Sequence, residues 1–491
     1  MEVQLLELRS TRGRLALTAS VLASATAMLD ATIVNVALPH IGADLDADVA
    51  DLQWVITGYL LALASCILLG GAAGDRWGRR RVFVIGAVWF GLASLACGLA
   101  PTLPILVIAR VVQGVGAAFL TPTSLALLQS AFVPGDRARA VGAWSGLGGL
   151  AGAIGPFVGG VVVDGPGWRW AFLLSVPLLV AAVLAARAIP AEEVVDRGAH
   201  FDGFGAALAI LTLAPLTWVL TEAPDRGWGH PAVVVGILVT VASATTFVLR
   251  MQRTAEPLVP PRLFRSRDFT VLNLATFALY AAIGANFFLV AYQLQVAVGW
   301  DALAAGSALL PATVLMLVGS SRSGALAVRI GPRIQLVVGP LLVALGSLLL
   351  SGVEPGASWL TDIAPGAILF GLGLTAFVAP LTASVMGSVD EAHVSTGSGV
   401  NNAVARTGGL VAVALIPSVA GLATAVGPDE VTDAYRTGMW MVAAFAALGA
   451  LVSAVGLRAP QQRESARERI CPVDGTPLQP DPAECPGLAR R

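Results

Sequence analysis

Long apolar runs constrain this chain more than any other feature of its sequence. Fourteen runs, each roughly 20 residues and so long enough to cross a ~30 Å hydrocarbon layer as a helix, alternate with short charged segments. Only 12% of the 491 residues are charged, whereas a soluble domain needs about 25%. The sequence therefore predicts an all-α, multi-pass protein of the cell membrane. The runs lie near 15–38, 52–73, 82–100, 103–125, 140–163, 170–188, 204–221, 231–249, 269–291, 302–321, 334–352, 363–386, 398–425 and 438–457.

The basic residues predict the orientation of these runs. All 30 are arginines. With a cytoplasmic N-terminus, 25 of them fall on the inner side and only Arg169, Arg226 and Arg436 on the outer side. Such an excess marks the cytoplasmic side of multi-pass proteins, so we expect both termini inside. A cleavable signal peptide is the alternative for the first run, but its removal would break this alternation.

The residue inventory excludes several kinds of chemistry. Without lysine there is no G-x-x-x-x-G-K-[ST] loop, so ATP hydrolysis by that route is excluded. The runs contain no nucleophile–base set and no cluster of metal ligands, so we expect neither an enzyme nor a metal or cofactor site. Cys471 and Cys485, in a polar tail expected to be disordered, are fewer than the four ligands of a structural zinc site. Any transport must therefore draw its energy from a gradient or from another subunit, and nucleic acid is not an expected partner.

A short segment occurs twice and divides the chain. The first copy follows the second run and the other follows the tenth; Gly71, Arg76, Gly78 and Arg80 recur in register as Gly324, Arg329, Gly331 and Arg333. We therefore expect two homologous six-helix halves with an extra pair of helices between them. Parallel repeats of this kind place the substrate path between the halves. The expected parts are an N-terminal segment (1–14), the first half (15–188), the extra pair (204–250), the second half (269–457) and a cytoplasmic tail (458–491).

The first copy of the repeat packs one acid and several arginines into a short turn. Asp75 can accept hydrogen bonds from the amides of a helix N-terminus and from arginine, so the cluster can hold one conformation and release it in another. The second copy has Val328 at this position and is expected to keep only the turn. A topology signal without a gate is the alternative. The gating loop comprises Gly71, Asp75, Arg76, Gly78, Arg79 and Arg80.

Two charged residues fall inside apolar runs. Arg110 must pair with an acid, with carbonyl groups or with water, because an unpaired charge in a bilayer costs several kcal/mol. Asp30 is the only acid deep in the first run, and burial favours the protonated form of a carboxyl group. The hypothesis is that Asp30 carries the proton. Structural roles, as a hydrogen-bonding cap for Asp30 and a carbonyl-binding arginine for Arg110, are the alternatives.

Together these segments resemble the major facilitator superfamily over about residues 15–457. The gating loop resembles its motif A, Arg110–Gly116 its motif B, and Gly155, Pro156, Gly159 and Gly160 its motif C, which is typical of antiporters. Residues 29–39 are similar to a motif of the fourteen-span drug:proton antiporters. The resemblance implies an exporter driven by the proton gradient, in which Arg110 adjusts the proton affinity of a nearby carboxylate.

Other polar residues in the runs are possible contacts along the substrate path. Their apolar surroundings favour amphipathic or cationic organic substrates, and a monomer is expected. For Arg406, lining of the path and anchoring near the cytoplasmic end both remain open. Export of one endogenous metabolite, antibiotic or lipid is the alternative to multidrug efflux, and a membrane sensor or scaffold without transport is a third. The residues of the possible path are Asn35, Gln113, Asn273, Tyr280, Asn286, Asn401 and Arg406.

Overall fold

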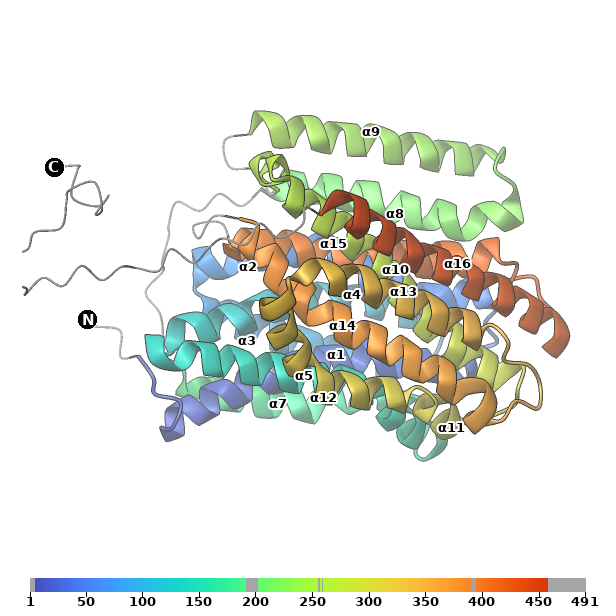
Figure 1. Cartoon of the computed structure of the whole chain (residues 1–491), viewed down its shortest axis with the longest axis horizontal. Helices are drawn as coiled ribbons and strands as arrows, with labels where there is room; N and C mark the ends of the chain where they lie inside the picture. Colours follow the sequence, from blue (N-terminus) through green and yellow to red (C-terminus); the bar gives the residue numbers. More distant parts are fainter. Residues whose placement is uncertain (1–4, 191–201, 255–256, 258, 390–393, 458–491) are drawn as a thin grey trace, which may run out of the picture. The chain divides into compact units, whose positions relative to one another are not determined.

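A computed structural model describes residues 5–190, 202–254, 257, 259–389 and 394–457. Every apolar run is helical (Figure 1), and in the described part of the chain the only β-type pairing is an isolated bridge between Leu6 and Phe132. The principal helices are α1 (Thr11–Leu45), α2 (Val49–Trp77), α3 (Arg79–Gly98), α4 (Leu103–Ala131), α5 (Pro134–Asp164), α7 (Ser175–Ala185), α8 (Gly203–Arg226), α9 (Pro231–Arg253), α10 (Arg267–Val296), α12 (Leu310–Ile330), α13 (Pro332–Leu350), α14 (Ala364–Gly387), α15 (Val394–Val419) and α16 (Pro428–Gly456).

The predicted all-α membrane fold agrees with these helices. Among the described residues, 13 helices are long and apolar enough to cross a membrane. The remaining run corresponds to α5, which has 31 residues and whose described apolar stretch is Ile154–Asp164. The tail with Cys471 and Cys485 lies outside the described residues. No group of three or more potential metal ligands occurs within the described ranges.

Some predicted runs are interrupted or longer than the sequence indicates. The run at 302–321 consists of α11 (Ala302–Ser307) and α12, because Pro311 at the start of α12 has no N–H to continue the helical hydrogen bonds. The sixth run begins with α6 (Arg169–Leu173) and ends with the 3₁₀ turn η1 (Ala186–Ala188). A further 3₁₀ turn, η2 (Pro261–Arg265), precedes α10, and a π turn, η3 (Trp359–Ile363), precedes α14.

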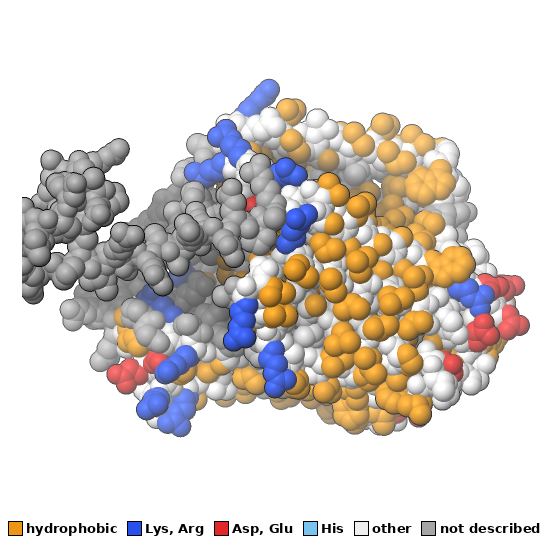
Figure 2. All heavy atoms as spheres, in the orientation of Figure 1, with side chains coloured by type: hydrophobic (Ala, Val, Ile, Leu, Met, Phe, Trp, Pro, Cys, Tyr) orange, Lys and Arg blue, Asp and Glu red, His pale blue; other side chains and the backbone are white. Residues whose placement is uncertain are grey.

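The surface of the protein has an apolar middle and charged ends, as a set of membrane-spanning runs requires. Figure 2 shows a broad band of apolar side chains, with most of the arginines toward one end and the larger group of acidic side chains at the other. Large apolar side chains are exposed on the protein surface, such as Leu92 at 64% and Leu238 at 62%. Lipid can cover such a band at no hydrophobic cost. The multi-pass location in a membrane follows from this band and from the helix lengths.

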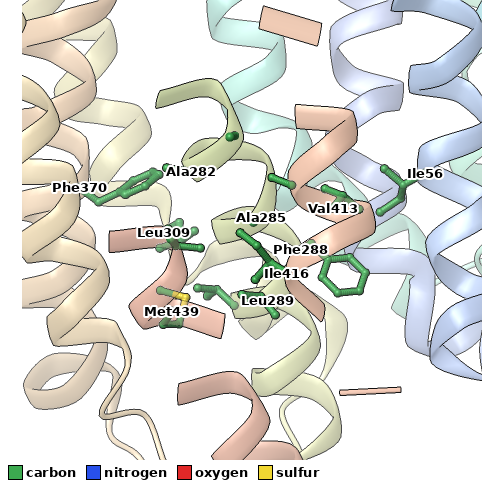
Figure 3. Packing of buried hydrophobic residues seen from close by; sticks show 14 of the residues in the cluster. Ile56, Ala282, Ala285, Phe288, Leu289, Leu309, Phe370, Val413, Ile416 and Met439 are labelled. Atoms are coloured by element: carbon green, nitrogen blue, oxygen red, sulfur yellow. The ribbon is translucent and has the colours of Figure 1, made fainter. Parts of the chain in front are cut away.

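Two groups of helices, α1–α7 and α10–α16, pack on each other unevenly. We call the end of the bundle where α1 meets α2 the α1–α2 end, and the end at the turn between α2 and α3 the α2–α3 end. Toward the α1–α2 end, side chains of both groups form one buried cluster, the seam cluster, which includes Ile41, Ile56, Leu289, Val413 and Ile416. Figure 3 shows part of this cluster, with Ile56 of α2 beside Val413 of α15.

Toward the α2–α3 end, the α1–α7 group has a buried cluster of its own. It includes Ala19, Leu63, Phe83 and Leu128, and its buried members all come from this group or the segments beside it. The fully buried core shared by both groups therefore lies toward the α1–α2 end, and at the α2–α3 end the second group adds only partly buried contacts such as Ala403 of α15. The extra helix α8 contacts α9, α2 and α15.

Candidate functional site

The two charges predicted inside apolar runs meet in the α1–α7 group. Arg110 of α4 donates from Nη1 to Asp30 Oδ2 of α1 over 2.6 Å, and from Nε to the Val55 carbonyl of α2 over 2.9 Å. The side chains of Arg110 and Asp30 are 1% and 0% exposed. Arg110 thus uses both an acid and a carbonyl group, two of the partners expected for it. Such a pair persists in a low-dielectric interior only when its remaining donors and acceptors are also satisfied.

An amide completes this cluster. Gln113, one turn after Arg110 in α4, accepts from Arg110 Nη1 through its Oε1 atom. Its Nε2 atom donates to Asp30 Oδ1 over 2.9 Å and to Ser94 Oγ of α3 over 2.8 Å. The sequence assigned Gln113 to the substrate path, but its side chain is fully buried in the ion-pair cluster. The spacing of three residues between Arg110 and Gln113, which puts both on one helix face, could have indicated this contact.

Aromatic rings enclose the guanidinium. The Tyr59 ring lies 4.3 Å and the Phe172 ring 5.6 Å from Arg110 Cζ, within cation–π distance. Tyr59 and Ser94 were not identified from the sequence, because a single tyrosine or serine in an apolar run has no distinguishing pattern. The cluster therefore draws on α1, α2, α3, α4 and α6. A proton added to Asp30 would cancel its charge and leave Arg110 with neutral acceptors.

The predicted antiporter helix, α5, makes close backbone contacts on two sides. A Cβ atom at Gly155 would lie only 1.8 Å from Thr32 Oγ1 of α1, so only glycine fits there. On its other side, a Cβ at Gly160 would lie 2.3 Å from Leu303 Cα of α11. A Cβ at Gly306 of α11 would likewise lie 2.0 Å from the Pro156 carbonyl oxygen. Gly160 of α5 and Gly306 of α11 thus bring the two groups of helices into close contact, whereas Gly155 packs within the α1–α7 group.

Polar contacts reinforce this seam at the α1–α2 end. Asp164, the last residue of α5, accepts hydrogen bonds from the Ala302 and Leu303 amides over 3.1 and 2.6 Å. Gln295 Nε2 of α10 donates to the Val36 carbonyl of α1 over 3.0 Å. A further contact joins Ser418 of α15 to Gln53 of α2. All these contacts lie at the same end as the seam cluster.

Comparison with known proteins decides the family. The model of the Major Facilitator Superfamily matches residues 20–413. The chain belongs to the major facilitator superfamily. It is 34% identical to a puromycin resistance protein of Streptomyces alboniger, covering 87% of each chain. It is also 34% identical to a tetracenomycin C resistance and export protein of Streptomyces glaucescens, covering 83% of this chain and 76% of that one.

Solved structures agree on the fold. A POT family transporter in complex with 5-aminolevulinic acid superposes with a TM-score of 0.67 at 14% identity, covering 93% of this chain and 99% of that one. The major facilitator fold predicted from the motifs is thus confirmed. Its members are transporters of small molecules, which also confirms that this chain is not an enzyme.

In this superfamily member, the turn of the gating loop and its repeat share one backbone conformation. Gly78 between α2 and α3 has φ +90°, and Gly331 between α12 and α13 has φ +82°. The residue before the loop, Gly70, packs closely on α4, where its Cβ would lie 2.0 Å from the Ala118 carbonyl oxygen, whereas Gly71 has open space around it. The role of Gly71 in a gate stays a prediction.

The structure describes only some of the charged side chains of the gating loop and its repeat. The side chains of Asp75 and Val328 lie outside the described set. Arg76 is exposed, and Arg79 and Arg80 are partly buried. In the second copy, Arg333 Nη2 donates to the Ala454 carbonyl over 2.7 Å. The latch assigned to Asp75 stays a prediction.

The remaining residues of the possible path lie in three different surroundings. Asn401 of α15 donates from Nδ2 to Asn273 Oδ1 and Thr276 Oγ1 of α10, over 3.1 and 2.8 Å. Asn286 is fully buried, and neither atom of its amide has a partner among the described residues. Asn35 donates within α1 to the Ala31 carbonyl. Tyr280 is partly buried in α10, and Arg406 is considered below.

Proposed function

We propose that this protein is a proton-coupled exporter of small organic molecules that works by alternating access. Two six-helix halves, α1–α7 and α10–α16, would rock against each other, with α8 and α9 as the extra pair. The observation that carries the proposal is the buried Asp30–Arg110 pair with its closed set of hydrogen bonds. An acid in this position can be charged or neutral only if its neighbours tolerate both states. In either state the Gln113 amide remains as a partner of Asp30, and the Val55 carbonyl remains as a partner of Arg110.

The contacts between the halves support a cycle of this kind. They gather at the α1–α2 end, where Asp164 and the glycines of α5 meet α11. With both termini cytoplasmic, as the arginines favour, this end faces outward and the molecule is closed to the outside. The side chain of Asp30 has no exposure in this state. A proton from outside would therefore reach Asp30 only after the seam opens, which couples proton entry to the change of state.

The first experiment measures efflux from proteoliposomes that contain the purified full chain. The probe is N-phenylnaphthylamine, a neutral fluorescent amphiphile, under an imposed proton gradient. We expect gradient-driven efflux in the wild type and its loss in Asp30→Asn. The isosteric amide keeps most of the hydrogen-bonding shape but cannot carry a charge. Efflux that survives an uncoupler, or full activity in Asp30→Asn, would contradict the coupling.

A second acid–arginine pair supplies the matched control. Asp202, at the start of α8, binds Arg250 of α9 over 2.8 Å, with side-chain exposures of 4% and 33%. Asp202→Asn makes the same chemical change in the extra pair of helices. We expect it to lower thermal stability by about 1–3 kcal/mol while gradient coupling remains. Loss of coupling in both variants would show that any broken ion pair impairs transport.

Export of a single antibiotic is the second candidate. It is favoured by the two relatives named above, each of which is named for resistance to one compound. A third relative, 32% identical, is a multidrug resistance protein. Competition assays separate the two: a narrow exporter would show inhibition of probe efflux by one chemical class only.

A further inference from the structure

Arg406 is a charged residue that the mechanism above does not use. It lies in α15, 12 residues after the helix begins at Val394, or about 18 Å along the axis. This is the middle of the helix, so anchoring at the cytoplasmic end does not explain it. The residue is partly buried. Among the described residues no hydrogen bond or ion pair reaches its guanidinium.

The helix face that carries Arg406 points toward the α1–α7 group. Gly399, two turns earlier on the same face, would place a Cβ atom 3.2 Å from Leu68 of α2. Two and three residues after Arg406, Gly408 and Gly409 lie against α10, where a Cβ atom would be 2.5 Å from the Phe277 carbonyl oxygen and 3.8 Å from that of Tyr280. Arg406 therefore lies where α2, α10 and α15 meet, between the two groups of helices.

The charges of this central region do not balance. Arg110 is neutralised by Asp30, and the other described acids of the principal helices lie near helix ends. Arg406 is left as one net positive charge. An unpaired arginine at this depth costs several kcal/mol, and functional proteins offset that cost with a partner or with water in a cavity. A transported molecule that brings an acid would supply the partner.

A second donor lies beside Arg406. Asn402 precedes it by one turn on the same side of α15, is partly buried, and has no hydrogen bond within the described part of the chain. Its neighbour Asn401 is instead occupied with α10. A guanidinium and an amide one helical turn apart can bind the two oxygens of one acid group.

We propose that Arg406 and Asn402 bind an acid group of the transported molecule, so that the substrate class is an amphipathic organic acid. The inference rests on the proposed export function and narrows it. It replaces the cationic substrates that the apolar interior favoured with molecules that carry a carboxylate, sulfonate or phosphate. The apolar side chains of the surrounding helices would hold the rest of the substrate.

A pair of probes that differ in one acid group tests this site directly. Anilinonaphthalene sulfonate and N-phenylnaphthylamine share their rings, and only the first carries a sulfonate. Binding to the purified full chain in detergent is followed by energy transfer from its tryptophans. We expect the wild type to bind the sulfonate more tightly than the neutral probe. In Arg406→Gln the Kd for the sulfonate should rise at least ~10-fold, about 1.4 kcal/mol, while that for the neutral probe changes less than ~2-fold.

Further variants separate recognition from folding. Arg406→Lys keeps the charge and should recover part of the sulfonate affinity. Arg253→Gln removes an exposed arginine at the end of α9 and should leave both affinities unchanged. Equal weakening of both probes in Arg406→Gln, no weakening of either, or no preference for the sulfonate in the wild type would overturn the inference. Gradient-driven efflux of both probes, compared between the wild type and Asp30→Asn, tests the export function separately, so either proposal can fail alone.

Discussion

The α1–α7 and α10–α16 groups share a backbone framework but differ in what they bury. Gly78 and Gly331 form the turns in the two copies of the repeat. Eight residues after each of them, Gly86 of α3 and Gly339 of α13 face a neighbouring helix. A Cβ at Gly86 would lie 3.2 Å from the Gly116 carbonyl oxygen, and one at Gly339 would lie 2.9 Å from that of Gly373. Gly116 and Gly373 therefore occupy corresponding places in α4 and α14.

Counting back from these glycines aligns the buried side chains. Arg110 corresponds to Ala367 and Gln113 to Phe370, both fully buried. Ser94, which binds Gln113, corresponds to Ser347, whose hydroxyl has no partner in the described structure. The same framework thus holds an ionic cluster in one group and an apolar core in the other. The comparison teaches that the repeat supplies the scaffold, whereas the proton chemistry proposed above would be confined to one copy. The other copy would then be free to recognise substrate.

The largest effect is expected at the corresponding positions Gln113 and Phe370, each changed to leucine in its own variant. Gln113→Leu leaves Asp30 Oδ1 and Ser94 Oγ without their amide donor, and a buried charge that loses a partner costs several kcal/mol. We expect gradient-driven efflux to fall at least ~10-fold, about 1.4 kcal/mol. Phe370→Leu leaves a cavity costing about 1–3 kcal/mol of stability. Efflux and Tm are measured on both; an equal loss of efflux would refute confinement to one copy.

A middle-sized effect is expected at the turn glycines. Gly78→Ala and Gly331→Ala each force a side chain into a backbone region that only glycine occupies readily, at φ +90° and +82°, costing about 1–3 kcal/mol. Both variants should lower Tm by similar amounts, because the two turns are alike. If the first copy is the gate, only Gly78→Ala should also slow efflux. A Tm loss in one variant alone would break the correspondence of the turns.

The smallest effect is expected at the paired serines. Ser94→Ala removes an acceptor from Gln113 and should cost about 1 kcal/mol, with a modest fall in efflux. Ser347→Ala removes a buried hydroxyl that has no partner, so stability should be unchanged or slightly higher. Thermal unfolding of both proteins in one detergent provides the measurement. A larger loss for Ser347→Ala would show that its hydroxyl has a partner in another state.

The fold could be predicted from the sequence, because bilayer thickness fixes helix length. All the apolar runs became helices, and α1 continues past the predicted boundary at residue 38 to Leu45, where Asp46 ends it with φ +50°. The breaks within runs were harder to foresee. Pro311 signals one of them locally, and Pro177 in the first turn of α7 marks the separation of α6 from α7 in the same way, because it has no N–H to donate to Leu173.

The charged residues of the candidate site could be predicted from the sequence, but its neutral residues could not. Asp30 and Arg110 stand out because a charge in an apolar run demands a partner. Ser94 and Tyr59 contact the cluster only because α2, α3 and α4 pack together, and Ser94 lies 19 residues from Gln113 in the chain. No local pattern distinguishes Ser94 from Ser65, which is also buried but has no hydrogen bond in the described structure.

The position of α8 determines where an apolar compound in the bilayer can reach the boundary between the two helix groups. Two lines of contact separate the helix groups, one between α2 and α15 and one between α5 and α11–α12. Because α8 contacts both α2 and α15, and α9 lies along α8, this pair shields the first line from the bilayer. The second line has no such cover among the described helices. Among the described helices, the line beside α5 is therefore the one that a compound dissolved in the lipid meets directly, by diffusion in two dimensions.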